Sequence, residues 1–121
     1  MTRAIRLELP YPPSVNALHR TVRGRPISSA KYRAWAASAA AMIHQQLREP
    51  DTIEGHYHLY IRATAPDRRR RDLGNLEKSI SDSLVDARVI ADDCNARVII
   101  SAWAGEPKKP GSIEVIVTEA A

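Results

Sequence analysis

The segment from Pro66 to Lys78 concentrates the charge of this sequence and reads Pro-Asp-Arg-Arg-Arg-Arg-Asp-Leu-Gly-Asn-Leu-Glu-Lys. Its four adjacent arginines repel one another and therefore need anions close by; they are Arg68, Arg69, Arg70 and Arg71. Phosphate groups suit the planar guanidinium fork, which can bind them bidentately. A solvated run of charges or a set of surface ion pairs is the alternative explanation for the arginines taken alone.

Acidic and amide side chains follow the arginines at spacings that suit a metal site. Asn75 and Lys78 lie roughly one and two helical turns after Asp72, and a compact fold could bring Asp92 and Asp93 back toward it. Mg²⁺ prefers hard oxygen ligands, with waters and substrate phosphates completing its coordination. A lysine beside such a site can offset charge on a phosphate under attack. The pattern indicates metal-assisted phosphodiester hydrolysis; a helix cap at Asp72 and an ordinary solvated turn at Asp92 and Asp93 are the structural alternatives.

The elements that must position these residues follow from the hydrophobic pattern. Alternation of apolar and polar residues predicts strands at about 3–9, 56–64, 98–103 and 113–117. Capping residues and apolar spacing predict helices at about 30–48 and about 72–87. Residues 14–28 are expected to form a loop, and residues 105–111 are expected to join the last two strands as a hairpin. The arginines are expected at the edge of the sheet. The order predicts an α+β fold: one small domain, 1–121, with a mixed four-stranded sheet and two main helices.

Composition limits the class of protein. The 121 residues suit one domain, and the single cysteine, Cys94, excludes an internal disulfide and a CxxC metal motif. Asp92 and Asp93 should disfavour its thiolate, so a buried or inert thiol is expected. His44 is expected at the surface, and His56 and His58 on a polar face of the sheet. The absence of a long apolar run predicts neither signal peptide nor membrane span, and we expect a cytoplasmic protein.

The distribution of charge says more than the net charge of +4. Basic clusters other than the arginine run frame the acidic stretch between residues 72 and 93; they comprise Arg20, Arg23, Arg25, Lys108 and Lys109. A basic frame around an acidic centre is typical of a protein that holds a polyanion and places metal ions on it.

The same residues resemble a known family over nearly the whole chain. Leu9-Pro-Tyr-Pro-Pro-Ser14 with Asn16, the segment Pro66–Lys78 and Ile90-Ala-Asp-Asp93 are similar to the RusA family of Holliday-junction resolvases, small phage and prophage endonucleases. The resemblance implies a homodimer of mixed α/β fold that requires Mg²⁺, for which Mn²⁺ should substitute. It also implies binding to branched DNA and symmetric cleavage of four-way junctions during DNA recombination and repair.

The resemblance carries over residue by residue. It implies that Asp72 and Asp93 are catalytic, metal-binding acids, with Asp92 as a neighbouring ligand, and that Lys78 is the functional lysine. The family's motif asparagine matches Asn75, and its basic loop matches Arg68, Arg69, Arg70 and Arg71. We expect these residues to bind DNA, together with Arg23, Arg25 and Asn16. The helix near residues 30–48, with Trp35, is a candidate dimer surface.

One position departs from the family motif Asp-Leu-Asp-Asn, because this chain reads Asp72-Leu73-Gly74-Asn75. Gly74 has no side chain with which to bind a metal ion. Three accounts remain open. Asp72 and Asp93 suffice with water as a further ligand, or Glu77 supplies the acid from one turn along. In the third account the protein binds junctions but cuts them poorly or not at all.

A different function class, a small basic RNA-binding module, would need aromatic stacking platforms. Only 5% of the residues are aromatic, and none lies within the arginine segment. The sequence therefore favours a nuclease or a junction-binding protein over an RNA-binding module.

Overall fold

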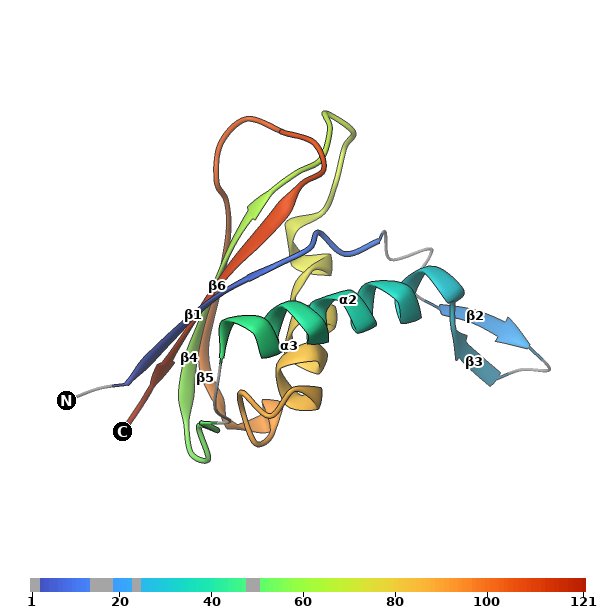
Figure 1. The fold of residues 1–121 in the computed structure, drawn as a ribbon. Coiled ribbons are helices and arrows are strands. Elements are labelled where there is room, and N and C mark those ends of the chain that lie inside the picture. Colours follow the sequence, from blue (N-terminus) through green and yellow to red (C-terminus); the bar gives the residue numbers. More distant parts are fainter. Residues whose placement is uncertain (1–2, 14–18, 23–24, 48–50) are drawn as a thin grey trace.

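A computed structural model describes residues 3–13, 19–22, 25–47 and 51–121. Its main sheet has the order β1-β6-β4-β5, with β1 at Ala4–Leu9, β4 at Tyr57–Thr64, β5 at Ala96–Trp103 and β6 at Ser112–Glu119. β6 runs antiparallel to both β1 and β4, whereas β4 and β5 are parallel. Two helices, α2 (Ala30–Gln46) and α3 (Glu77–Asp86), cover the same face of this sheet (Figure 1). The α+β fold expected from the sequence is confirmed.

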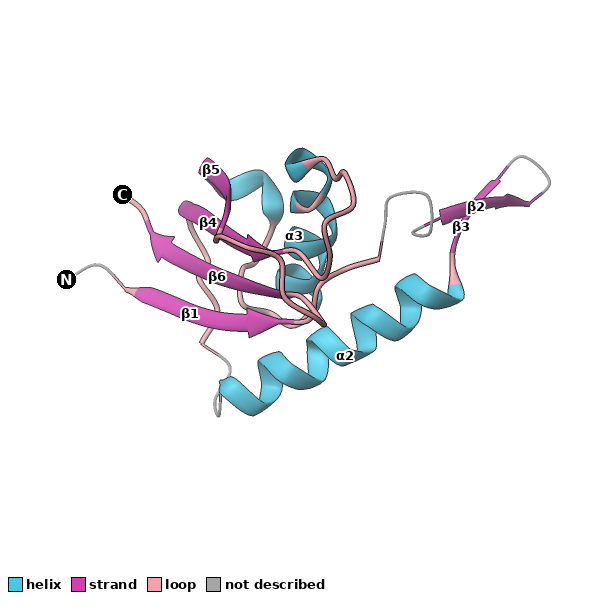
Figure 2. Cartoon of the chain, turned by 90° about the horizontal axis from the view of Figure 1, so that it is seen from above, coloured by secondary structure: helices cyan, strands magenta, loops and turns pink. Residues whose placement is uncertain are grey.

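The core lies between the two helices and one face of the sheet. Strands β1, β4 and β6 alternate buried and more exposed residues, as their sequences predict, because successive side chains of a strand point to opposite faces. α2 contributes Trp35, Ala39 and Ile43 to the core, and α3 contributes Ile80 and Leu84. α2 passes β1 and also contacts α3, which lies on the same side of the sheet (Figure 2).

The connection from β4 to β5 carries most of the candidate site. Parallel strands need a crossover connection, and α3 provides it. The chain leaves β4 through the arginine segment and a short 3₁₀ helix, η1 (Leu73–Asn75), before α3 begins. A second 3₁₀ helix, η2 (Asp93–Asn95), leads into β5. The arginines therefore follow an inner strand, not the edge of the sheet as expected.

Three further expectations from the sequence were wrong. Residues 14–28 are not all loop, because β2 (His19–Val22) and β3 (Arg25–Ser28) pair as a hairpin beyond the start of α2 (Figure 1). The second helix does not begin at residue 72 or 73, since η1 precedes α3. β5 and β6 do not form a hairpin, because β4 lies between them.

The long β5–β6 connection reaches the start of the arginine segment through Gly111. This residue has a φ of 82°, and a Cβ atom there would lie 3.0 Å from Pro66 and from the Cβ of Tyr11. Glycine fits both the left-handed backbone and the close approach. The connection therefore packs against the strand end from which the arginines emerge.

Candidate functional site: an arginine segment followed by acidic residues

Asp67 organises the arginine segment. Its carboxylate lies 2.7 Å from the Arg71 guanidinium and accepts a hydrogen bond from the backbone N–H of Arg69 at 3.0 Å. The hydrogen bond from Arg71 is the largest influence that lowers the pKa of Asp67, to about 2. The ionised carboxylate of Asp67 therefore holds the backbone and side chains of the arginine segment together.

Arg71 is held differently from the other three arginines. Besides the ion pair, it donates to the carbonyl oxygens of Asp67 and Arg69 at 3.0 and 3.3 Å, and its guanidinium lies 5.7 Å from the centre of the Tyr11 ring. Its side chain is only 20% exposed. Arg71 thus has a structural role in this conformation, although the sequence predicted only DNA contacts for it.

The remaining arginines point to solvent. Arg68 pairs with Glu106 at 2.8 Å, and the Nε of Arg69 lies 3.8 Å from the carboxylate of Asp67. Among the described residues, Arg70 has no ion-pair or hydrogen-bond partner. Exposed pairs of this kind contribute about 0–1 kcal/mol, so a phosphate can replace them at little cost.

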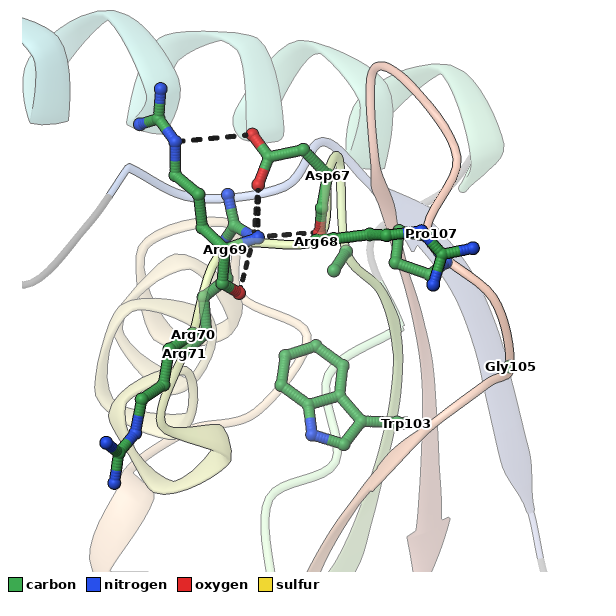
Figure 3. Close-up of a pocket in the computed structure, with 9 residues that line it drawn as sticks. Asp67, Arg68, Arg69, Arg70, Arg71, Trp103, Gly105 and Pro107 are labelled. Carbon is green, nitrogen blue, oxygen red and sulfur yellow. Dashed lines mark hydrogen bonds and ion pairs between the residues drawn. The ribbon is translucent and has the colours of Figure 1, made fainter.

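A shallow pocket of about 420 Å³ opens beside the segment. The four arginines and Asp67 form one wall, and Ala65, Trp103 and Pro107 provide the apolar part (Figure 3). Trp103 ends β5, far from the arginines in sequence, and the pairing of β5 with β4 brings it here. No aromatic residue lies within the arginine segment of the sequence, but the fold places Trp103 beside it.

Asp72 caps η1 at the end of the arginine segment. Its Oδ1 accepts a hydrogen bond from the N–H of Gly74 at 3.0 Å, and its side chain is exposed. A Cβ atom at Gly74 would lie 3.4 Å from that same Oδ1, which is ordinary van der Waals contact. A carboxylate at position 74 would therefore stand directly beside Asp72.

Lys78 contacts Asp93 and a carboxylate on its own helix. It lies in the first turn of α3, and its Nζ is 3.0 Å from Oδ1 of Asp82 and 3.8 Å from Oδ2 of Asp93. The hydrogen bond to Asp82, followed by the charge of the same carboxylate, raises the pKa of the lysine. Asp82 was not predicted as a site residue.

The hydroxyl of Tyr57 contacts Asp93, and the charges of Asp93 and Glu77 both act on it. This hydroxyl donates to the carbonyl oxygen of Asp93 at 3.5 Å, and burial, then the charges of Asp93 and Glu77, raise its pKa to about 12. Glu77 also accepts a hydrogen bond from the hydroxyl of Ser81 at 2.6 Å. The charge of Glu77, like that of Asp93, therefore acts on Tyr57.

Asp92 caps η2, as Asp72 caps η1. Its Oδ1 accepts from the backbone N–H of Cys94 at 2.9 Å, and this bond is the main cause that lowers the pKa of Asp92. Cys94 is exposed rather than buried. The contact with the Asp92 side chain raises the pKa of the Cys94 thiol, in agreement with the inert thiol expected from the sequence.

The structure brings only part of the predicted site together. Lys78 joins Asp93, and Asp72 lies just before α3 with Asn75 exposed beside it. No group of three His, Cys, Asp or Glu side chains is arranged to hold a metal ion within 3–13, 19–22, 25–47 and 51–121. Asn16 and Arg23 lie outside the described residues, and Arg20 and Arg25 are placed only as backbone of β2 and β3.

The histidines and Trp35 do not belong to the site. His44 and His58 are exposed, and His56 contacts Arg97. Trp35 is buried and donates its indole N–H to the carbonyl of Pro10, so its ring is not exposed on the surface of α2 that was a candidate for the dimer.

Several contributors could not be found from spacing along the chain. Asp82 lies one turn after Lys78 on α3. The others lie in segments that are distant from the motif in sequence; they are Tyr11, Tyr57, Trp103 and Glu106. Only for Asp82 was a local signal present, because it stands four residues after Lys78 and faces it on the helix.

The part of the chain that the structure describes has no helix with the length and apolar character of a membrane span.

The family model described as endodeoxyribonuclease RusA matches residues 10–118. The crossover junction endodeoxyribonuclease RusA of Escherichia coli strain K12 is 37% identical over 119 residues, covering 93% of this chain and 92% of the relative. The proteins of that name from Enterobacteria phage 82 and Shigella sonnei are 35% and 36% identical with the same coverage. Because the match spans nearly all of both chains, this protein belongs to the endodeoxyribonuclease RusA family.

Proposed function

We propose that this protein is a structure-specific endodeoxyribonuclease that binds four-way DNA junctions and resolves them by symmetric, metal-dependent phosphodiester cleavage. The relatives bear the name crossover junction endodeoxyribonuclease. The observation that carries the proposal is the sequence of exposed arginines, Asp72, Lys78 and Asp93 along one crossover connection, with Lys78 in contact with Asp93. The residues 1–121 would act as one endonuclease domain in the cytoplasm, where bacterial or phage DNA is found.

We propose that Asp72 and Asp93 together hold a divalent cation, and that they hold it weakly because they supply only two carboxylates. Mg²⁺ commonly takes one or two carboxylates and completes its shell with waters and substrate phosphates. Asp72 and Asp93 would supply the two carboxylates, with Mn²⁺ able to substitute, and Asp92 would be a further ligand. When bound, the ion would lower the pKa of a water and offset charge on the phosphate.

The chain's own residues would orient the DNA and neutralise its charge. Arg68, Arg69 and Arg70 would exchange their weak surface pairs for backbone phosphates. Lys78 would leave Asp82 for the scissile phosphate, where an ammonium offsets the negative charge that develops during attack. Further DNA contacts are proposed for Asn75 and for Asn16, Arg23 and Arg25.

A second candidate function, junction binding with weak or no cleavage, is favoured by Gly74. With a hydrogen atom in place of a side chain, the site loses one negative ligand beside Asp72. Fewer charged ligands weaken the affinity for a hard cation while they strengthen the attraction for DNA. We propose that Glu77 compensates in part, because its charge acts on the same Tyr57 hydroxyl as that of Asp93.

We also propose a homodimer, because a four-way junction presents two equivalent strands and a two-fold dimer presents two equivalent sites. The face of the sheet opposite the helices supports this proposal. One row across it contains Ile116, Tyr60 and Ile100 in register, and Ile100 is 51% exposed. This apolar row on the open face is the surface that we assign to the second copy.

A cleavage assay tests the function directly. A synthetic four-way junction and a linear duplex of the same sequence would be incubated with the protein, with Mg²⁺, Mn²⁺ or a chelator. The nuclease proposal expects paired cuts in the junction only when metal is present. Tight, salt-sensitive junction binding without products in either metal would select the second candidate, and equal binding of junction and duplex would overturn both.

A further inference from the structure

The two tryptophans of the chain have different environments. Trp35 is 6% exposed, and its indole N–H donates to the carbonyl of Pro10 at 2.8 Å. Trp103 is 40% exposed, and its indole N–H has no acceptor among the described residues. A tryptophan usually buries its large apolar surface and satisfies its N–H when it serves the core. Trp103 therefore does not have the environment of a core residue.

The fold keeps one side of the Trp103 ring open. Trp103 is in register with Ala63 of β4, and it is the last residue of the edge strand β5. The short side chain of Ala63 cannot cover an indole, and no strand among the described residues pairs with the other side of β5. α3 begins only after the arginine segment has passed this end of the sheet, so the ring faces the pocket.

The pocket around Trp103 combines two chemistries. Its apolar part is the indole with Ala65 and Pro107, and its charged part is the arginine segment. In the close-up, the guanidinium groups of Arg68 and Arg70 extend to opposite sides of the indole (Figure 3). A ligand that satisfies both parts must carry a flat apolar group and an anionic group a short distance apart.

We infer that Trp103 is a stacking platform for an unpaired or unstacked nucleobase, whose neighbouring phosphates are held by Arg68 and Arg70. A nucleotide supplies a flat base and an anionic phosphate, and cationic grooves with aromatic platforms are the general means of holding single-stranded nucleic acid. The inference rests on the proposed function and extends it, because it names a residue that would read the branch.

This platform would distinguish a branch point from an ordinary duplex. Arginines that bind phosphates attract any DNA, since the phosphate backbone is the same in both. In a continuous duplex the faces of the bases are covered by their neighbours, whereas strand exchange at a branch point can leave a base face accessible. Stacking on Trp103 would therefore add affinity for the junction alone.

The test compares Trp103→Ala, Trp103→Leu and Trp103→Tyr in the full-length protein. Dissociation constants would be measured with a chelator present, so that cleavage plays no part, for an immobile four-way junction and a duplex of the same sequence. Loss of one stacking contact should weaken junction binding about tenfold for the Ala and Leu variants and change duplex binding much less. Trp103→Tyr, which keeps a ring, should bind the junction nearly as the parent does.

Arg70→Ala is the matched control in the same pocket. It should weaken junction and duplex binding alike. The dependence of its DNA affinity on salt concentration should also fall by the amount expected for about one phosphate contact. Trp103→Ala should leave that salt dependence unchanged. A fluorescent adenine analogue at the branch point should lose part of its contact-dependent quenching with Trp103→Ala. Circular dichroism would confirm that each variant is folded. If Trp103→Ala does not fold, Trp103→Leu serves in its place, because leucine preserves more of the apolar volume.

The outcomes separate this inference from the proposed function. If the parent prefers the junction and Trp103→Ala retains the same preference, the stacking platform is wrong while the function stands. If Trp103→Ala instead dissociates a dimer without changing junction binding per site, Trp103 is an assembly residue, and the inference is overturned. If the parent shows no preference for the junction, the proposed function itself fails and the platform fails with it.

Discussion

At position 74 a glycine stands beside Asp72, and the geometry there permits a carboxylate. The Cβ position lies 3.4 Å from Asp72 Oδ1, and the φ of Gly74 is not in the left-handed region. Gly74→Asp should therefore fold, place two carboxylates side by side and increase the affinity for Mg²⁺. We expect metal-dependent junction cleavage to rise on the order of tenfold, because substitutions of residues around a metal site commonly change metal affinity or activity by at least that factor.

The uncharged analogue Gly74→Asn provides the control, because it has nearly the same shape but a neutral amide. Metal binding can be followed apart from cleavage, as the rise in melting temperature on adding Mg²⁺, which should be larger for Gly74→Asp than for the parent. If Gly74→Asp cuts no faster at saturating Mg²⁺, the glycine does not limit catalysis.

Lys78 is restrained by Asp82, and this restraint should oppose DNA binding. The pair is an exposed i,i+4 contact of 3.0 Å on α3, the kind worth about 0.3–0.5 kcal/mol. Asp82→Asn should free the lysine and tighten junction binding. The gain in affinity should be roughly twofold larger than the gain from removing a negative charge that does not contact Lys78. Asp86→Asn supplies that remote loss, since Asp86 is exposed one turn later on the same helix. Equal effects of the two substitutions in a fluorescence anisotropy titration would show that only net charge matters.

At the scale of the element, Asp67 should decide whether the arginine segment is ordered. Its pKa of about 2 lies below the ordinary value of 3.8, because the ionised form is bonded to Arg71. The ionised carboxylate therefore stabilises the folded segment above about pH 4, and this contribution is lost as the pH falls through about 2. The carboxyl resonance of Asp67 in an NMR titration should move at about pH 2, and Arg71→Ala should shift its midpoint toward the ordinary value.

Asp67→Asn should uncouple affinity from catalysis. Removing the carboxylate leaves four arginines without their central anion, so duplex DNA should bind more tightly. The N–H of Arg69 and the guanidinium of Arg71 lose an acceptor, so the chain just before Asp72 should become less ordered and cleavage should fall. Faster amide hydrogen exchange at Arg69 would report the loss of order directly; unchanged exchange together with unchanged cleavage would refute it.

Elements with a clear pattern could be predicted from the sequence, and contacts between elements could not. β1, β4 and β6 alternate cleanly, and α2 has Ser29 as its cap, accepting from the N–H of Tyr32. The hairpin of β2 and β3 was missed because Gly24 and Pro26 read as loop residues. η1 was missed because periodicity does not separate a 3₁₀ turn from the start of an α-helix.

The candidate site divides in the same way. Asp72, Lys78 and Asp93 were predicted from a motif, whereas the surroundings of that motif depend on how strands pair. Trp103 reaches the arginines because β5 pairs with β4. The hairpin expected from the sequence paired β5 with β6 instead. Long-range pairing of this kind leaves no signal in the local sequence.

At the scale of the whole molecule, the sheet has one covered face and one open face. The helices cover the inner face (Figure 1). The open face carries Ile100 and Val98 on β5, next to Tyr60 of β4 and Ile116 of β6. An apolar patch that crosses strands is unusual on a monomer and typical of an interface. Edge strand β5 also leaves unpaired backbone groups beside this patch.

The proposed two-fold dimer predicts opposite results for two neighbouring isoleucines. Ile100 is 51% exposed on the open face, whereas Ile99 is 43% exposed on the face of Leu59, which the helices cover. Ile100→Lys should place a charge in the interface and yield monomers in sedimentation, which would nick junctions once rather than cut paired strands. Ile99→Lys, with the same change one residue away, should remain dimeric. A parent protein that sediments as a monomer, or dissociation by Ile99→Lys alone, would exclude this face, because a two-fold interface on it requires Ile100 and not Ile99.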